Sequence, residues 1–260
     1  CHIRYGEKGS IKMPKVITFN IRYTDDPDGN SIAERAPRLK KVIDGRDPDL
    51  IGFQECTPAW MEFIEKYWGE DYEIINQYRA HHSLESTPIL YKRDKFECLK
   101  KGWFWLSDTP EEESGGWDEC GCYRICCYAV LRCKSCGKTF TFMNTHFGFG
   151  DDNQVKSAKL IRAKSEEISA APAFCTGDFN MTPEKIGYKT MTEFFTDVNA
   201  VTEKDFNTTY HGYDKDYTGE HIDYCFIDKR IKPVSSKVIY DLVDGKFPSD
   251  HYGIEFKLEI

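Results

Sequence analysis

Short apolar runs along the chain end abruptly in polar residues. Residues 16–20, 50–55 and 173–175 are rich in β-branched, aromatic and small apolar side chains, and Asn, Glu or a Gly-Asp turn closes each run. Such runs predict buried strands. Apolar side chains recur at helical spacing behind Thr57-Pro58 and within residues 151–169, which predicts two amphipathic helices. Strands that alternate with helices indicate a parallel or mixed sheet.

The rest of the pattern adds strands, two more helices and one long loop. Residues 107–121 are acidic and rich in glycine, which predicts a surface loop. One short helix is predicted to open near Pro37 and another at Thr182-Pro183, because Thr followed by Pro is a common N-cap and first helical residue. Further strands are predicted at residues 72–75, 88–91, 96–99, 125–132, 140–144, 221–227 and 252–258, of which 125–132 and 140–144 form a hairpin.

Residues 174–183 combine a strand end, a tight glycine and a helix start. In an extended segment residues i and i+2 point the same way, so Asp178 and Asn180 would face one spot while Phe179 turns into the core. This geometry suits a metal or phosphate site. By itself, a Gly-Asp-x-Asn turn is more often an ordinary loop, so its meaning depends on the residues predicted near it.

The length of the chain allows one large α/β domain or two small ones, since it has 260 residues. No break in composition divides it, so one domain is predicted for residues 13–260. Residues 1–12 lack the periodic pattern of the rest and are interpreted as an N-terminal extension or an artificial remnant.

The formal net charge of -8 disfavours bulk electrostatic binding to nucleic acid and fits a small phosphorylated substrate better. No apolar run approaches the roughly 20 residues that span a bilayer, and no signal pattern precedes the first strand. A soluble, cytoplasmic protein is therefore expected. The densest basic cluster consists of Lys92, Arg93, Lys95, Lys100 and Lys101.

Eleven cysteines are an odd number for a disulfide framework, and many, such as Cys225, lie inside apolar strands. Free thiols in a reducing compartment explain them most simply. Cys133 and Cys136 could form half of a zinc site with Cys120 and Cys122, but this spacing is loose for a zinc ribbon. A hairpin turn at Cys133–Cys136 is therefore favoured over zinc.

Several strands place polar groups where one rim of a sheet would be. Oxygen donors together with histidines match Mg²⁺ or Mn²⁺ better than zinc. Each residue alone has an ordinary structural explanation, such as a solvated strand end or a turn cap, whereas their joint occurrence indicates a site on a rigid scaffold. The residues are Asn20, Glu55, His146, Asp178 with Asn180, and Asp250-His251.

Six blocks of the sequence resemble, in order, the signature blocks of the endonuclease/exonuclease/phosphatase superfamily. They span nearly the whole chain from Val16 onward. The resemblance implies an α/β fold, namely a two-sheet mixed β-sandwich flanked by helices in four layers (α/β/β/α), with a Mg²⁺-dependent phosphoester hydrolase site at one rim. The intervening sequence resembles a bacterial branch with mostly unassigned substrates. The blocks are Thr18-Phe19-Asn20, Gln54-Glu55, Asn144-Thr145-His146, Gly177-Asp178-Phe179-Asn180, Ile222-Asp223-Tyr224 and Ser249-Asp250-His251-Tyr252.

The histidine at position 146 makes the chain similar to pancreatic-type deoxyribonucleases and neutral sphingomyelinases rather than to abasic-site nucleases. Those relatives pair this histidine with a glutamate, for which Glu85 is the candidate here. They also place an arginine near the phosphate, at the start of a strand, and Arg124 occupies such a position in this sequence. Both matches are looser than the six blocks, and a solvated Glu85 and a surface Arg124 remain alternatives.

The resemblance also implies the role of each residue. Glu55, assisted by Asn20, would hold Mg²⁺ (or Mn²⁺), with Asp250 as a second ligand. Asp178 would activate the attacking water, and Asn180 would hold the water or the phosphate. The remaining roles fall to the histidines: His251, positioned by Asp223, would bind the phosphate or assist proton transfer, and His146, oriented by Glu85, would protonate or stabilise the leaving oxygen.

Three functions remain consistent with the sequence. The first is a metal-dependent phosphodiesterase or phosphatase that acts on a small or lipid-linked substrate. The second is a nuclease for DNA or RNA with the same site, which would need the basic cluster at residues 92–101. The third is an inactive binding module of the same fold. No protein partner is evident.

Overall fold

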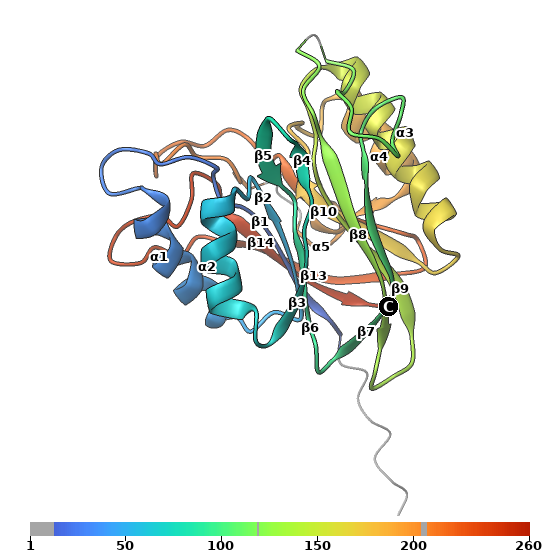
Figure 1. Ribbon diagram of the computed structural model, residues 1–260, viewed down its shortest axis with the longest axis horizontal. Coiled ribbons are helices and arrows are strands. Elements are labelled where there is room, and N and C mark those ends of the chain that lie inside the picture. The colour runs from blue at the N-terminus through green and yellow to red at the C-terminus, as the bar shows by residue number, and fades with distance from the viewer. Residues whose placement is uncertain (1–12, 119, 204–206) are drawn as a thin grey trace, which may run out of the picture.

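Two six-stranded sheets face each other in the computed structural model, which describes residues 13–118, 120–203 and 207–260 (Figure 1). The extension predicted at residues 1–12 lies outside the described residues. In spatial order, the first sheet contains β13 (Lys232–Ile239), β14 (Gly253–Glu259), β1 (Lys15–Asn20), β2 (Leu50–Gln54), β6 (Ile89–Lys92) and β3 (Tyr72–Ile75). The second contains β11 (Thr196–Asp197), β12 (Asp223–Ile227), β10 (Ala173–Asp178), β9 (Thr139–His146), β8 (Ile125–Cys133) and β7 (Phe96–Trp105).

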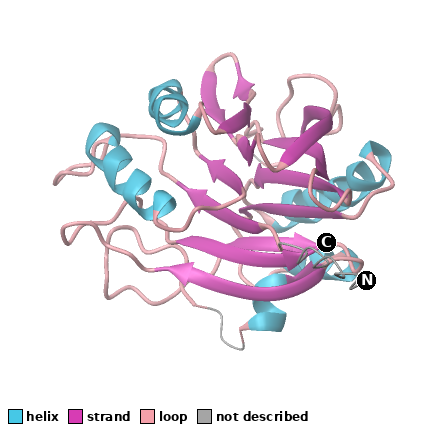
Figure 2. Ribbon diagram, turned by 90° about the horizontal axis from the view of Figure 1, so that it is seen from below, coloured by secondary structure: helices cyan, strands magenta, loops and turns pink. Residues whose placement is uncertain are grey.

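Helices cover the outer face of each sheet, as the view from below shows (Figure 2). The helices α1 (Ile32–Asp44) and α2 (Pro58–Trp68) pack on the first sheet, and α3 (Asp151–Ile168) and α4 (Ile186–Phe194) pack on the second. A short helix, α5 (Val198–Thr202), and a small hairpin of β4 (Tyr78–Ala80) and β5 (Ser83–Ser86) complete the fold. The predicted four-layer α/β/β/α sandwich is therefore confirmed.

Successive side chains of each strand point to opposite faces of its sheet, and this alternation divides the core into three layers. On β1, Val16 belongs to the apolar cluster between the sheets, whereas Ile17 and Phe19 pack with the helices outside. On β10, Phe174 faces the other sheet and Cys175 faces the outer helices. The inward-facing positions become polar toward one end of the sandwich, which is the end where the strands carry the predicted site.

A polar network joins the two sheets just below that end. Asn144 on β9 donates from Nδ2 to the carbonyl oxygens of Phe53 (2.7 Å) and Pro88 (3.2 Å) across the sandwich. Its Oδ1 accepts from Gln54 Nε2 (2.7 Å) and Thr176 Oγ1 (3.0 Å). The side chains of Asn144, Gln54 and Thr176 are fully buried. Directional bonds therefore fix the position of one sheet over the other at this level.

Two predicted helix starts are wrong. The first helix begins at Ile32 rather than near Pro37, because Ser31 and Glu34 form a capping box. This cap outweighs Pro37, which lies inside α1 and removes one intrahelical N–H. Thr182-Pro183 does not open α4: the Thr182 carbonyl accepts from Lys185 N (3.0 Å) in a turn, and the helix begins at Ile186. The helix predicted behind Thr57-Pro58 is confirmed as α2.

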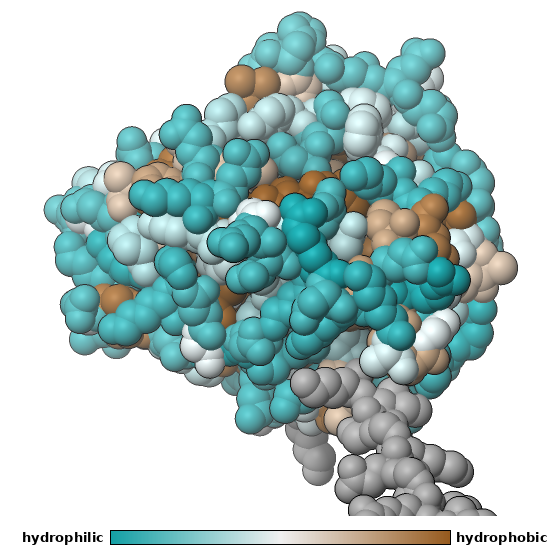
Figure 3. Space-filling view, turned by 60° about the horizontal axis from the view of Figure 1, so that its bottom comes forward, coloured by the Kyte–Doolittle hydropathy of each residue, from teal (hydrophilic) through white to brown (hydrophobic). Residues whose placement is uncertain are grey.

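The structure also adds elements that the pattern did not predict, namely β4, β5, β11, β13 and α5, and β7 extends to Trp105. Cys133 and Cys136 lie at the β8–β9 hairpin turn, where the Cys133 carbonyl accepts from Gly137 N (2.8 Å), and this confirms the predicted hairpin. The ten cysteines among the described residues are free thiols. No helix in the described part of the chain is long and apolar enough to span a membrane. The face shown in Figure 3 is mostly hydrophilic, with apolar side chains in small separate areas.

Asp197 links the stability of the second sheet to pH. Its buried carboxylate accepts hydrogen bonds from the Tyr188 hydroxyl and from Asn199 N, both at 2.9 Å. Burial raises its pKa from 3.8 to about 6, although these hydrogen bonds oppose the rise. A raised carboxyl pKa means that the folded state holds its proton more tightly than the unfolded state. The resulting stabilisation is complete below pH 4 and is lost as the pH rises through 6.

We therefore expect Asp197→Asn, which cannot ionise, to become more stable relative to the wild type between pH 4 and 6, by about 3 kcal/mol at most. Urea unfolding at several pH values across this range measures the difference in free energy of unfolding. Asp71→Asn, altered at an exposed carboxylate, should follow the wild type at every pH. A constant difference between Asp197→Asn and the wild type would contradict the expectation.

Candidate active site

Strand pairing brings the predicted residues together at one end of the sandwich. Strands β1 and β2 are parallel neighbours in the first sheet, and β9 and β10 are parallel neighbours in the second, so their carboxyl ends meet at one edge. Asp178 at the end of β10 pairs in register with His146 on one side and with Asp223 on the other. The sequence blocks that lie far apart in the chain are therefore adjacent because of the register.

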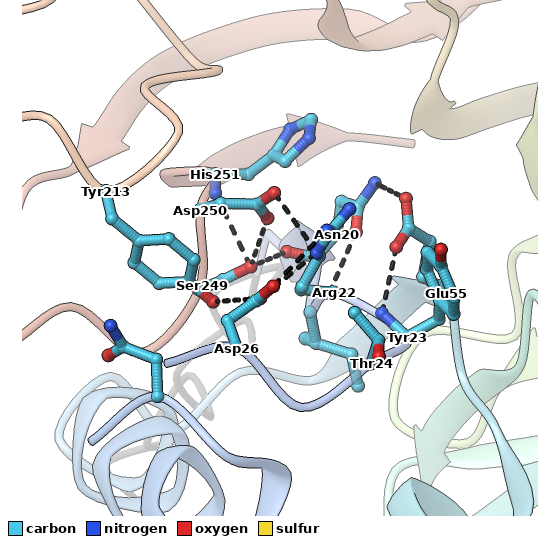
Figure 4. Close-up of polar contacts among 12 residues, drawn as sticks. Asn20, Arg22, Tyr23, Thr24, Asp26, Glu55, Tyr213, Ser249, Asp250 and His251 are labelled. Atoms are coloured by element: carbon cyan, nitrogen blue, oxygen red, sulfur yellow. Dashed lines mark hydrogen bonds and ion pairs between the residues drawn. The ribbon is translucent and has the colours of Figure 1, made fainter. Parts of the chain in front are cut away.

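Asn20 connects the halves of the site that the two sheets contribute. Its Nδ2 donates to Glu55 Oε1 on the first sheet, a contact drawn in Figure 4, and to Asp178 Oδ2 on the second, both at 3.0 Å. Its Oδ1 accepts from Arg22 N (3.0 Å). Glu55 Oε2 accepts from Tyr23 N (2.9 Å). In this geometry Asn20 positions the two carboxylates with its amide N–H groups, and its oxygen faces the backbone.

Asp178 and Asn180 converge as predicted, while Phe179 is fully buried among the outer helices. Asn180 N donates to Asp178 Oδ1 (2.9 Å), and Asn180 Nδ2 donates to His146 Nε2 (2.9 Å). Since an amide NH₂ group can only donate, His146 Nε2 accepts and its proton lies on Nδ1. Burial and nearby arginines lower the pKa of His146 well below its usual value. His146 is therefore neutral and donates only from Nδ1, while its Nε2 lies 3.5 Å from Asp178 Oδ2.

His251 and Asp223 form a buried pair beside Asp178. His251 Nδ1 lies 3.0 Å from Asp223 Oδ2, and its Nε2 lies 3.8 Å from Asp178 Oδ2. Burial opposes a charge on His251, but Asp223, Asp178 and Asp250 together outweigh burial and raise its pKa to about 10. Burial and the neighbouring Asp223 also raise the pKa of Asp178, to about 7. The group thus combines a cationic donor with a carboxylate that accepts protons readily.

Arg22 and Asp26 are site residues that the sequence did not single out. Arg22 Nε lies 3.1 Å from Asp26 Oδ2 and 3.6 Å from Asp250 Oδ2, as Figure 4 shows. Ser249 Oγ also donates to Asp250 Oδ1 (3.2 Å). The carboxylate of Asp250, predicted as a second metal ligand, is therefore held by an arginine. The only sequence signal for Arg22 was its place two residues beyond Asn20.

Glu85 and Arg124 both reach the site, although Glu85 makes a different contact from the one predicted. Glu85 forms an ion pair with Arg79 on the neighbouring strand of the small hairpin, and burial raises its pKa. The hydrogen bond of His146 goes to Asn180 instead. Arg124 is 7% exposed, and its Nε has no hydrogen-bond partner in the described part of the chain. Because Arg124 also lines the pocket, its guanidinium is suited to bind an anion there.

These residues surround a pocket of about 510 Å³, a volume within the usual range for small-molecule sites. Asn20 and Asp223 lie beneath it and hold the residues above. Its walls also include residues that the sequence did not indicate, among them Tyr23, Phe149, Tyr210 and Glu220. The predicted residues in the walls are Glu55, Glu85, Arg124, His146, Asp178, Asn180, Asp250 and His251.

The donor set fits a hard divalent cation. Glu55 and Asp178 both accept from the same Asn20 nitrogen, so their carboxylates lie close together and face one pocket. Asp223 adds a buried oxygen, Oδ1, that has no hydrogen-bond partner among the described residues. Carboxylate oxygens are the ligands that Mg²⁺ and Mn²⁺ prefer. Glu55 is the best-placed ligand, because Asp250 is already paired with Arg22.

Comparisons with known proteins agree with this geometry. Residues 17–251 match the model of the Endonuclease/Exonuclease/phosphatase family. A family protein from Bacteroides thetaiotaomicron is 28% identical with a TM-score of 0.89, and the match covers 95% of this chain and 97% of that one. A family protein from Bacteroides vulgatus is 30% identical with a TM-score of 0.86, covering 95% and 98%.

A third similar structure has a stated activity. It is a mannosyl-6-phosphatase from Bacteroides thetaiotaomicron, 27% identical with a TM-score of 0.86, and the match covers 95% of this chain and all of that one. The family model extends from β1 to the His251 that pairs with Asp223, just before β14. The chain therefore belongs to the endonuclease/exonuclease/phosphatase family, whose members are phosphoesterase hydrolases.

Proposed function

We propose that this protein is a metal-dependent phosphoester hydrolase that acts on a small phosphorylated substrate. The observation that supports this most strongly is the convergence of Glu55, Asp178, His146, His251 and Arg124 on one pocket. Hydrolysis of a phosphoester needs carboxylates that can hold a cation, a carboxylate beside a cationic histidine, and an unpartnered arginine.

Each residue contributes a distinct step. Asp178 orients the attacking water and takes its proton, since Asn20 and Asn180 fix both of its oxygens. His251, held by Asp223, donates from Nε2 to a phosphate oxygen.

Arg124 lines the pocket and offers its guanidinium to another phosphate oxygen. His146, as a neutral N–H donor, stabilises the leaving oxygen, which takes its proton from water. Glu55 is placed to hold Mg²⁺ or Mn²⁺, whose charge would polarise the phosphate.

Two observations support a small phosphorylated substrate. The mannosyl-6-phosphatase among the similar structures favours a sugar phosphate or a related small ester, although lipid-linked esters share the same chemistry. The basic cluster that a nuclease would need is largely neutralised, because Lys92 pairs with Asp47, Arg93 with Glu73 and Lys95 with Asp49. It also lies where β6 ends and β7 begins, at the opposite end of the first sheet from Glu55. A small substrate is therefore preferred over DNA or RNA, and the intact set of site residues favours an enzyme over an inactive binding module.

Metal dependence gives the first test. Hydrolysis of p-nitrophenyl phosphate, bis(p-nitrophenyl) phosphate or mannose 6-phosphate should fall below about a tenth in excess EDTA and return with Mg²⁺ or Mn²⁺, because several kcal/mol of charge stabilisation is removed. Glu55→Gln should raise the Mg²⁺ concentration needed for half-maximal rate. Glu62→Gln, altered at an exposed glutamate on α2, is the matched control. Turnover that is indifferent to chelation would contradict the proposal.

A further inference from the structure

Phe149 is an exposed aromatic residue in the wall of the pocket. Its side chain is 64% exposed, more than any other large apolar residue in the described part of the chain. Single exposed apolar side chains are ordinary on protein surfaces, so exposure alone does not indicate a role. The next most exposed ones, Val201 and Ile186 at 57% and 53%, do not line this pocket. The position of Phe149 is what distinguishes it.

The backbone that presents Phe149 is firmly held. Phe147, two residues earlier, is fully buried, and its N–H donates to the Asp178 carbonyl (2.9 Å). Gly148 packs so tightly that an added Cβ would lie 2.2 Å from Asn153 Nδ2. That same Asn153 nitrogen donates to the Phe149 carbonyl (3.2 Å). Phe149 is therefore directed outward by a fixed loop on the end of β9, at the cost of leaving an aromatic ring in water.

Phe149 also lies on the side of the site where the leaving group should be. It follows His146, the proposed donor to the leaving oxygen, by three residues, and both line the same pocket. The pocket has a second exposed aromatic residue, Tyr23, in the loop after β1, whose ring centroid lies 5.1 Å from the Arg22 guanidinium. The pocket thus combines the phosphate-binding groups with two exposed aromatic rings.

We propose that Phe149 is a specificity-determining residue that stacks on the leaving group, and that this group therefore contains a ring with an apolar face, either a sugar ring or an aromatic ring, rather than an open chain. The inference rests on the proposed hydrolase function. A fixed, solvent-exposed ring loses little conformational entropy on binding and gains contact area with a flat partner. An acyclic alcohol offers no such face, so it gains little from Phe149.

The test compares Phe149→Ala with the wild type on ring-bearing and acyclic substrates in Mg²⁺. For mannose 6-phosphate and p-nitrophenyl phosphate, we expect kcat/KM to fall about tenfold, mainly through a rise in KM. The reason is that Phe149 contacts the ring both in the bound substrate and in the transition state. For glycerol 3-phosphate the change should stay below about twofold. Phe149→Trp should restore the ring-bearing substrates. Ile186→Ala, a similar truncation outside the pocket, should change neither.

The outcomes separate this inference from the function on which it rests. Equal losses on ring-bearing and acyclic substrates, or no loss on any substrate with an active wild type, would overturn the stacking role alone. If Phe149→Ala lost no activity on any substrate, Phe149 would instead be assigned to contact with another macromolecule. A wild-type protein that hydrolyses none of these esters in Mg²⁺ would overturn the hydrolase function and the stacking role together.

Discussion

Replacing Asp178 with asparagine is expected to lower kcat by about 10²- to 10⁴-fold, the usual contribution of a positioned general base. The amide keeps the shape of the side chain but cannot take a proton from water. In the wild type, Asn20 Nδ2 and Asn180 N fix the two carboxylate oxygens, so no other group in the pocket holds an equivalent orientation beside His251. The measurement is turnover of p-nitrophenyl phosphate and mannose 6-phosphate at saturating Mg²⁺.

The control for this experiment is Asp152→Asn, which removes the same charge from an exposed position on α3. It should retain the rate of the wild type. Circular dichroism and a thermal melt establish that Asp178→Asn is folded. A folded Asp178→Asn protein with a rate within about threefold of the wild type, purified free of contaminating phosphatase, would refute the role assigned to Asp178.

Replacing Asn144 with alanine is expected to lower the free energy of unfolding by about 3–5 kcal/mol. The substitution removes four hydrogen bonds, three of them between the sheets, and leaves buried partners unsatisfied, at a cost of about 1–3 kcal/mol for each group that finds no new partner. Urea unfolding monitored by tryptophan fluorescence measures the loss. The effect is large because the partners, which include the Phe53 carbonyl and Gln54, have no access to water.

Thr141 on the same strand provides a matched control. It is also fully buried, but its Oγ1 has no hydrogen-bond partner among the described residues. Thr141→Val keeps the shape of the side chain and removes an unpaired hydroxyl, so its stability should stay within about 1 kcal/mol of the wild type or rise. If Asn144→Ala proved as stable as Thr141→Val, the polar network could not be what fixes the sheets.

The sequence predicted the sandwich well because alternation is a property of the strands themselves. Ile17 and Phe19 face one way and Val16 the other, so the three-layer core follows from a period of two. The site residues were predictable for a related reason. Asn20, His146 and Asp178 occupy inward-facing positions at the ends of strands that meet at one edge. Pairing of distant strands, such as Asp178 beside Asp223, was implied only by the family resemblance.

The features that escaped prediction depend on tertiary contacts. Arg22 was not predicted as a site residue, and Glu55 and Asn180 were predicted without their backbone conformation. All three have left-handed backbones, with φ of 63°, 61° and 50°, which residues with side chains adopt rarely and which no local pattern indicates. These turns aim the side chains into the pocket. The pairing of Glu85 with Arg79 likewise depends on a hairpin that has no clear alternating pattern.

Strand β13 was missed because it is an edge strand. Most of its side chains are partly exposed, and only Ser236 and Ile239 are buried, so it lacks the apolar run that marks a central strand. The predicted start of the first helix was wrong because two local signals competed. Ser31 caps the helix, whereas Pro37 favours a start further along the chain. Local signals of similar strength can be ranked only when the surrounding packing is known.

The amide network at Asn144 has a further consequence for catalysis. Glu55 belongs to one sheet and Asp178 to the other, so the distance between them depends on how the sheets are aligned. An interface made only of hydrocarbon could slide by an ångström with little change in contact, because dispersion is not directional. Hydrogen bonds from Asn144 and Asn20 resist such shear. Variants that loosen them should lose catalytic alignment at temperatures where the protein is still folded, so inactivation on heating would precede unfolding.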